Sequence, residues 1–226
     1  MNRVDLTFDS QFDNIVLLEH YPWVGKDYAS SPIKVLVLGD SHYTVDKNGE
    51  FCEEEYETCK TDKNYTRNII NCSIDEGPWS FHRNLLKTFM EENDLDAEKF
   101  WSKVASYNFI QEPMKGIHEL PSDSNYETAW KCLADVVRIL KPTFCLFVGL
   151  RNDTCISVLK EKDVDYQINY PETKINNSYP RTGEIRFKDG YKLPFIMIHH
   201  TAQYYSPELW KEYLKEQIPQ VMDFLA

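Results

Sequence analysis

The segment Lys34–Tyr43 constrains the fold of this chain more than any other. Its apolar run Val35–Leu38 has no polar alternation, which is typical of a strand buried on both faces, as in a parallel sheet. Gly39 then frees the backbone, and a group of polar residues follows at once. These residues are Asp40, Ser41, His42 and Tyr43. Because ligands bind beyond the carboxyl ends of the strands in open α/β sheets, the segment predicts both a fold class and a site.

Other apolar runs predict the rest of the sheet and the helices between its strands. The predicted strands are Ile33–Leu38, Val104–Ile110, Thr143–Val148 and Pro194–His199. The predicted helices are Ser80–Asn93, Tyr126–Leu140 and a last one that Ser206 caps, with Pro207 in its first turn. Strands that alternate with helices indicate right-handed crossovers and a parallel sheet with helices on both sides.

Two long polar segments are predicted to be irregular. Lys47–Thr66 contains five glutamates, and we interpret this acidic cluster as the solvated face of a loop. Asp163–Arg186 is rich in Asn, Tyr and Pro, and we expect it to wrap the surface before a hairpin at Lys188–Gly190. Long insertions of the second kind often shape a substrate cleft.

Size and composition favour one α/β domain over residues 1–226, with 42% hydrophobic residues to fill its core. We expect a cytoplasmic protein, because no apolar run reaches membrane-spanning length and the first residues do not resemble a signal peptide. The six cysteines show no CxxC spacing, so we expect reduced structural thiols and neither a metal nor another cofactor. The net charge of −11 argues against strong binding to the phosphate backbone of duplex nucleic acid.

Polar side chains of three kinds follow the predicted strands. Asp40 follows the first strand, Asn108 lies near the end of the second, and the pair His199 and His200 closes the fourth. Strand side chains alternate, so only one of the two histidines can line the site while the other packs or bonds to the backbone, and we favour His199 for the site. A carboxylate, an amide and an imidazole at one sheet edge suit a reaction that develops a cation and releases an anion.

Five short motifs between residues 33 and 215 resemble, in their order, those of the uracil-DNA glycosylase superfamily. They are Gly39–Tyr43, Gly77–Leu86, Asn108, the stretch from Lys141 to Gly149, and His199–Thr201. Asp40 takes the place of the acid in the branch whose first motif begins Gly-Glu. His199–Thr201 is similar to the second motif, His-Pro-Ser, although its proline and serine are replaced.

The resemblance implies a three-layer α/β/α sandwich around a central four-stranded parallel sheet. It also implies a hydrolase that cleaves the N-glycosidic bond of uracil or another damaged base in DNA. Asp40 would activate water or stabilise the oxocarbenium-like sugar, and His199 would stabilise the departing base anion. The partner would be DNA, either single-stranded or with a flipped-out base, or a nucleotide.

The same resemblance implies how the base would be held. Asn108 would form hydrogen bonds to the base edge, and Trp79 or Phe81 would stack on the ring. Tyr43 would form one wall of the pocket. The remaining residues expected to contact the substrate are Ser41, His42, His200 and Thr201.

Two other functions remain open from the sequence. Gly39–His42 also resembles the first block of the SGNH serine esterases, in which Ser41 would be the nucleophile. No Asp lies three residues before His199 or His200, however, so the catalytic triad of that family is incomplete. The third possibility is a glycosylase-like domain that binds a nucleotide or nucleic acid without chemistry, which the acidic charge favours.

Overall fold

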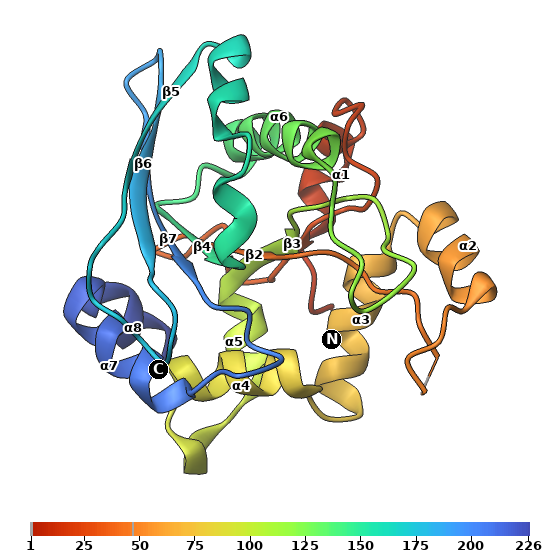
Figure 1. Cartoon of the computed structure of the whole chain (residues 1–226), viewed down its shortest axis with the longest axis horizontal. Helices are drawn as coiled ribbons and strands as arrows, with labels where there is room; N and C mark the ends of the chain where they lie inside the picture. The colour runs from red at the N-terminus through yellow and green to blue at the C-terminus, as the bar shows by residue number, and fades with distance from the viewer. Residues whose placement is uncertain (1, 47) are drawn as a thin grey trace.

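A seven-stranded sheet forms the centre of the computed structural model, which describes residues 2–46 and 48–226 (Figure 1). Its strand order is β1-β3-β2-β4-β7-β6-β5. The strands are β1 (Trp23–Val24), β2 (Val35–Gly39), β3 (Val104–Asn108), β4 (Phe144–Val148), β5 (Val164–Asn169), β6 (Arg181–Phe187) and β7 (Lys192–Ile198). The sheet is therefore wider than the four strands that the sequence predicts.

The four predicted strands form the parallel part of this sheet. β2 pairs in parallel with both β3 and β4, and β4 pairs in parallel with β7. β1 adds an antiparallel strand at one edge, and β6 and β5 extend the other edge as antiparallel strands. The prediction of an irregular Asp163–Arg186 is thus wrong at its two ends, which form β5 and β6. These strands were hard to recognise because β5 is the edge strand, β6 lies beside it, and most of their side chains are only partly buried or exposed.

The helices include all three that the sequence predicts. They are α1 (Asp9–Phe12), α2 (Glu53–Thr61), α3 (Tyr65–Asp75), α4 (Ser80–Phe89), α5 (Ala97–Lys103), α6 (Asp123–Leu140), α7 (Pro207–Gln217) and α8 (Pro219–Leu225), with short 3₁₀ helices at Leu6–Phe8, Glu92–Asp94, Leu150–Asp153 and Ile156–Lys162. Ser206 caps α7 as predicted, because its side chain accepts a hydrogen bond from the Leu209 N–H. Among the described residues, no helix has both the length and the apolar character needed to cross a membrane.

The prediction of a loop over Lys47–Thr66 is wrong, although Lys47 itself lies outside the described residues. α2 occupies Glu53–Thr61 of this segment, and α3 begins at Tyr65 before the segment ends. α2 buries only Cys59, so it has no apolar stripe to mark it as a helix. Its first turn instead carries Glu53, Glu54 and Glu55, whose negative charges favour the N-terminal end of a helix.

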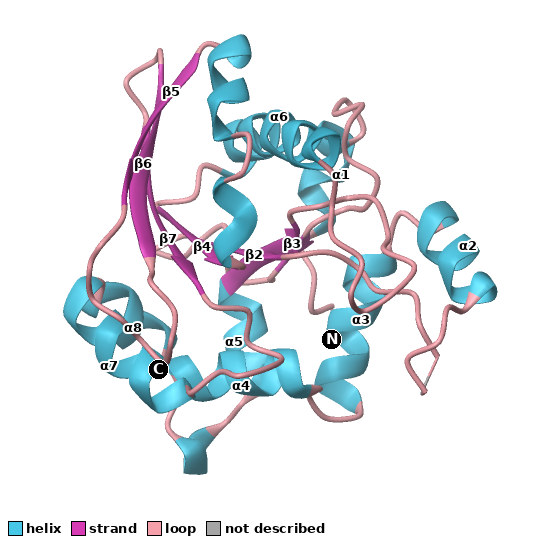
Figure 2. Ribbon diagram, viewed as in Figure 1, coloured by secondary structure: helices cyan, strands magenta, loops and turns pink. Residues whose placement is uncertain are grey.

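Helices cover both faces of the sheet, as Figure 2 shows. Leu36 and Leu38 of β2 pack on the side of α6, whereas Val35 and Val37 pack on the side of α4, α5, α7 and α8. The side chains of a strand alternate between faces, so both halves of this apolar run are buried. This arrangement explains why β2 lacks polar alternation.

The parallel strands end at one edge of the sheet. Gly39 lies opposite Asn108, and Val148 lies opposite Ile198. The pairing continues past the end of β2, because the Ile110 N–H donates to the Asp40 carbonyl at 2.9 Å. This register brings the residues that follow β2, β3 and β7 to a common edge.

Candidate functional site

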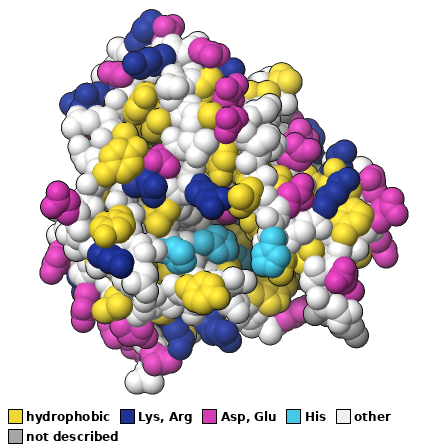
Figure 3. All heavy atoms as spheres, viewed as in Figure 1, with side chains coloured by type: hydrophobic (Ala, Val, Ile, Leu, Met, Phe, Trp, Pro, Cys, Tyr) yellow, Lys and Arg dark blue, Asp and Glu magenta, His cyan; other side chains and the backbone are white. Residues whose placement is uncertain are grey.

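A pocket of about 280 Å³ lies at the carboxyl ends of β2 and β3. Figure 3 shows histidine side chains in a hollow near the middle of the face, with hydrophobic and basic side chains around them. Most of the predicted site residues line this pocket. They are Asp40, Ser41, His42, Tyr43, Trp79, Phe81, Asn108 and His200. His199 and Thr201 are not part of its lining.

Asp40 supplies a carboxylate whose environment is unusual. Its Oδ1 is buried and has no hydrogen-bond partner among the described residues. Burial raises the pKa of Asp40 to about 6, and the positive charge of Arg151 opposes this rise. A buried polar atom without a partner in a pocket indicates that a ligand or water completes its contacts. Asp40 is therefore poised to act as a base or as a negative charge opposite a developing cation.

The histidine in the pocket is His200, and the prediction that placed His199 there is corrected. The ring nitrogens of His199 are engaged elsewhere, Nδ1 with the Ser178 hydroxyl at 3.0 Å and Nε2 with the Gln203 carbonyl at 3.1 Å. β7 ends at Ile198, whose side chain packs on the α4 side of the sheet. His200 continues this alternation and lies against Phe81 at the start of α4, with ring centroids 5.2 Å apart.

The tautomer of His200 follows from its neighbours. The Ala202 N–H donates to His200 Nδ1 at 3.4 Å, which assigns the ring proton of the neutral imidazole to Nε2. Burial, together with neighbouring His199, lowers the pKa of His200 to about 4. The imidazole is therefore neutral at pH 7 and can donate a hydrogen bond from Nε2.

Asn108 lies against β2 because Gly39 has no side chain. A Cβ at position 39 would overlap the Asn108 Oδ1 and would lie 3.7 Å from the Phe81 ring. Gln111 holds the chain beyond Asn108, since its amide donates to the Asn108 carbonyl at 2.7 Å. The glycine in the first motif thus makes room for the amide of the second strand.

We expect replacement of Gly39 by Ala to lower the free energy of unfolding by about 1–3 kcal/mol, because the new methyl group must displace Asn108. Urea denaturation followed by fluorescence would measure the change. Gly116→Ala is the matched control, since a Cβ there meets nothing within 4 Å. Equal effects of the two substitutions would contradict the steric role of Gly39.

Aromatic side chains form the walls of the pocket. Phe81 packs between His200 and His82, with ring centroids 5.2 Å from each. Trp79 is half exposed at the rim, and burial raises the pKa of Tyr43, which stays protonated. Flat rings of this kind are suited to a planar heterocycle, on which they can stack.

Further residues of the pocket come from α3 and α4, and the sequence analysis missed them. Tyr65 and Thr66 begin α3, and the hydroxyl of Thr66 lies 3.0 Å from His42 Nε2. Burial lowers the pKa of His42 to about 3 and that of His82 to about 4, so both rings are neutral at pH 7. α3 starts within the segment taken as a loop, so the sequence offered no sign that it faces the site.

Ser41 and Thr201 have no arrangement that suits nucleophilic catalysis. The Ser41 hydroxyl is buried and has no hydrogen-bond partner in the described part of the chain, so no histidine activates it. Thr201 is buried outside the pocket, where its hydroxyl donates to the Phe81 carbonyl at 2.9 Å. Its own carbonyl accepts from the Asn84 amide at 2.7 Å, so Thr201 fastens the end of β7 to α4.

Residues 2–46 and 48–226 contain no group of three or more His, Cys, Asp or Glu side chains placed to hold a metal ion. The six cysteines are all free thiols, and burial raises the pKa of Cys59, Cys132 and Cys145. These thiols are therefore protonated at pH 7 and serve as small apolar groups.

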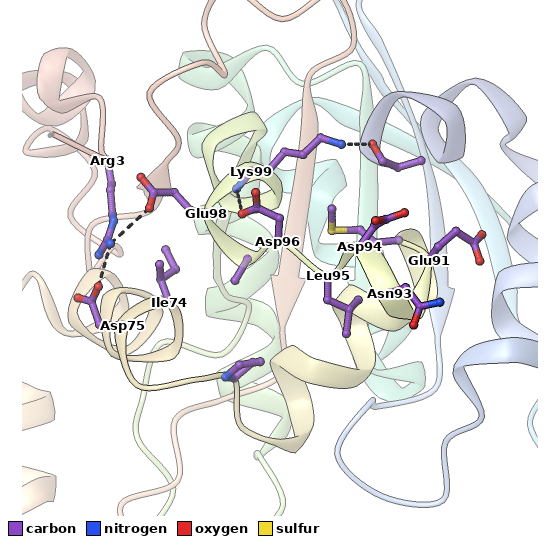
Figure 4. A pocket seen from close by; sticks show the side chains of 14 residues that line it. Arg3, Ile74, Asp75, Glu91, Asn93, Asp94, Leu95, Asp96, Glu98 and Lys99 are labelled. Carbon is purple, nitrogen blue, oxygen red and sulfur yellow. Dashed lines mark hydrogen bonds and ion pairs between the residues drawn. The ribbon is translucent and has the colours of Figure 1, made fainter.

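A larger cavity of about 930 Å³ lies elsewhere, beside α5 and the C-terminus (Figure 4). Several of its charged side chains already have partners. Arg3 bridges Asp75 at 2.8 Å and Glu98 at 3.5 Å, and the Lys99 ammonium donates to the Ala226 carbonyl at 2.8 Å. This acidic region precedes β3, at the opposite end of that strand from the Asp40 pocket.

Neither a scan against models of known protein families nor a search of curated proteins returned a match for this chain. The geometry of the Asp40 pocket and the order of the motifs around it therefore carry the functional proposal.

Proposed function

We propose that this protein is a DNA glycosylase-like hydrolase that cleaves the N-glycosidic bond of uracil or another damaged base. One observation carries the proposal. A buried carboxylate without a partner, Asp40, shares a pocket of about 280 Å³ with the amide of Asn108 and the neutral imidazole of His200. The fold would then be glycosylase-like, with four parallel strands as its core and β1, β5 and β6 as additions to that core.

The pocket suits a base that is flipped out of the DNA base stack. Phe81 offers an aromatic face, and Asn108 offers both a donor and an acceptor to the edge of a heterocycle. Tyr43 closes another side of the same pocket. A base held in this way would present its glycosidic bond toward Asp40 at the end of β2.

The reaction requires one water molecule and no redox step. The bond between C1′ and the base nitrogen breaks, and its electron pair leaves with the base. Asp40 stabilises the positive charge that develops on the sugar and accepts a proton from water as the new C1′–O bond forms. His200 donates a hydrogen bond from Nε2 to the base anion, which avoids the cost of forming an imidazolium.

Incubation with uracil-containing oligonucleotides, single-stranded and duplex, tests this proposal. Abasic sites that break in alkali are the expected product. Oligonucleotide binding without abasic sites would instead identify a non-catalytic binding module. A burst of p-nitrophenol from p-nitrophenyl acetate that Ser41→Ala abolishes would identify an esterase and overturn the proposal.

We expect the rate of base release to rise about tenfold per pH unit below pH 6 and to level off above pH 7. The pKa of Asp40 is raised to about 6, so the active carboxylate is a minor form in more acidic solution. His200 stays neutral across this range, because its pKa is lowered to about 4. Single-turnover rates between pH 4.5 and pH 8 measure the profile. A flat profile would rule out Asp40 as the titrating group.

A further inference from the structure

Four exposed aromatic side chains lie at the carboxyl edge of the parallel strands, where the Asp40 pocket opens, and we call them the aromatic rim. They are Trp79, Tyr170, Tyr179 and Tyr204, with exposed fractions of 50%, 63%, 52% and 88%. Large aromatic side chains are costly to leave in water, so several of them at one edge of the sheet indicate a contact surface.

Hydrogen bonds between loops hold the members of the rim near the site. The Asn176 amide donates to the Tyr204 carbonyl at 2.8 Å, and the Ser178 hydroxyl lies 3.0 Å from His199 Nδ1. The turn before Tyr179 is therefore fastened to the loop that follows β7. That loop also supplies Ala202 to the pocket wall, two residues before Tyr204.

Tyr204 is held in a backbone conformation that is unfavourable for a bulky residue. Its φ is +50°, in the left-handed region, and its ring is almost fully exposed. Strain of this kind persists at sites where the surroundings hold it for a functional reason. The exposed ring therefore points to a partner that covers it.

Tyr170 directly follows β5 at this edge of the sheet and contacts the short helix that follows β4. Its hydroxyl donates to the Asp153 carboxylate at 3.1 Å, and the Arg181 guanidinium lies 5.7 Å from its ring centre. Arg151 starts from the same helix and acts electrostatically on Asp40 in the pocket. Tyr170 thus belongs to the same edge as the site.

The side chains beside the pocket include positive charges, in contrast to the negative net charge of the whole molecule. Arg83, one helical turn after Trp79, and Arg151 are exposed, and within the described ranges neither has a carboxylate within 4 Å. The net charge is nevertheless −11, and the acidic cavity of Figure 4 lies at the far end of β3. Two arginines that are unpaired in the described part of the molecule, together with several exposed aromatic rings, suit a ligand that offers unpaired bases for stacking and needs only a few phosphate contacts.

From these contacts we infer that the aromatic rim binds single-stranded DNA across the pocket mouth, in preference to duplex DNA. This inference rests on the proposed function and specifies its substrate. Unpaired bases can stack on exposed rings, whereas the bases of a duplex are stacked on one another already. Duplex binding depends mainly on phosphate neutralisation, for which this acidic chain provides little surface.

The test is a fluorescence anisotropy titration of the full chain carrying Asp40→Asn, with a labelled uracil-containing oligonucleotide of about 12 nucleotides. The single strand should bind at least about tenfold more tightly than its duplex. The slope of log affinity against log salt should lie between about −1.4 and about −2.1, the range for two or three phosphate contacts on a single strand. Equal or tighter duplex binding, or a much steeper slope, would overturn the inference.

Variants of the rim identify where the strand lies. Tyr204→Ala and Tyr179→Ala should each weaken single-strand binding by about 5- to 10-fold and leave duplex binding unchanged. Val16→Ala, at a side chain that is 93% exposed on another loop, is the control and should change neither. Unchanged single-strand affinity in both tyrosine variants would refute a role for the rim.

Failure of this inference and failure of the proposed function give different results. Base release from both substrates, with equal affinity for single strand and duplex, would retain the glycosylase and reject the rim. Tight single-strand binding that depends on Tyr204, without abasic sites in the unsubstituted protein, would retain the rim as a binding surface and reject the enzyme.

Discussion

Replacement of Asp40 by Asn is expected to slow base release by about 10³-fold while it makes the folded protein more stable. The loss of rate follows because an amide neither accepts a proton from water nor carries the charge that stabilises the sugar cation. The gain in stability follows because Asp40 Oδ1 is buried without a partner within the described chain. A neutral amide in that place avoids the cost of a buried charge.

The size of the stability effect depends on pH. Burial raises the pKa of Asp40 from 3.8 to about 6, so the folded protein binds its proton more tightly than the unfolded chain. Stability is therefore lost as the pH rises from about 4 to about 6, and the accumulated cost above pH 6 is about 3 kcal/mol. Asp40→Asn removes this cost, so its free energy of unfolding should exceed that of the unsubstituted protein at pH 7.5.

Urea denaturation at pH 7.5 and at pH 4, combined with single-turnover base release, measures both effects. The stability difference should be several times smaller at pH 4, where the carboxyl is protonated in the folded protein and partly protonated in the unfolded chain. Asp165→Asn is the control, because Asp165 is exposed on β5 and the substitution should alter neither quantity. A variant that loses stability at pH 7.5, or keeps its rate, would contradict the role given to Asp40.

The second large effect distinguishes the two adjacent histidines. His200→Ala should lower the rate of base release by about 10²- to 10³-fold, since it removes the donor that stabilises the base anion. His199→Ala should lower the rate by less than about threefold, because the ring of His199 bonds to Ser178 and Gln203 outside the pocket.

Rates at saturating substrate, with circular dichroism as a check of folding, compare the two variants. His200→Gln keeps an amide N–H near the former Nε2 and should recover part of the lost rate, which a purely structural role would not predict. The assignment fails if His199→Ala is the slower variant. It also fails if His200→Gln is as slow as His200→Ala although both proteins are folded.

The hydrophobic pattern of the chain was enough to locate the parallel strands and the main helices. Val35–Leu38 is apolar because both of its faces are covered, and α6 shows its buried stripe over several turns. The positions of Asp40 and Asn108 at the ends of their strands could be predicted for the same reason. Parallel strands that share a register deliver their next residues to one edge.

Elements with little buried surface could not be recognised in this way. α2 buries one residue, and most side chains of β5 and β6 are only partly buried or exposed. Their local sequences resemble loops because tertiary contacts, rather than an apolar pattern, stabilise them. The contributions of Tyr65, Thr66 and His82 to the pocket were missed for a related reason, since they depend on where α3 and α4 pack.

The sequence by itself determined that a carboxylate, an amide and a histidine pair would meet beyond the parallel strands, because strand order and polarity are local properties of the chain. Only the tertiary structure decided which histidine faces the pocket. His200 follows the alternation of Ile198, on the sheet face that packs against α4, whereas Met197, two residues before His199, packs on the α6 side. The pocket opens on the α4 side, where Phe81 and His200 lie beside Gly39 and Asn108. Alternation along a strand is visible in sequence, but which face becomes the site depends on how distant helices pack.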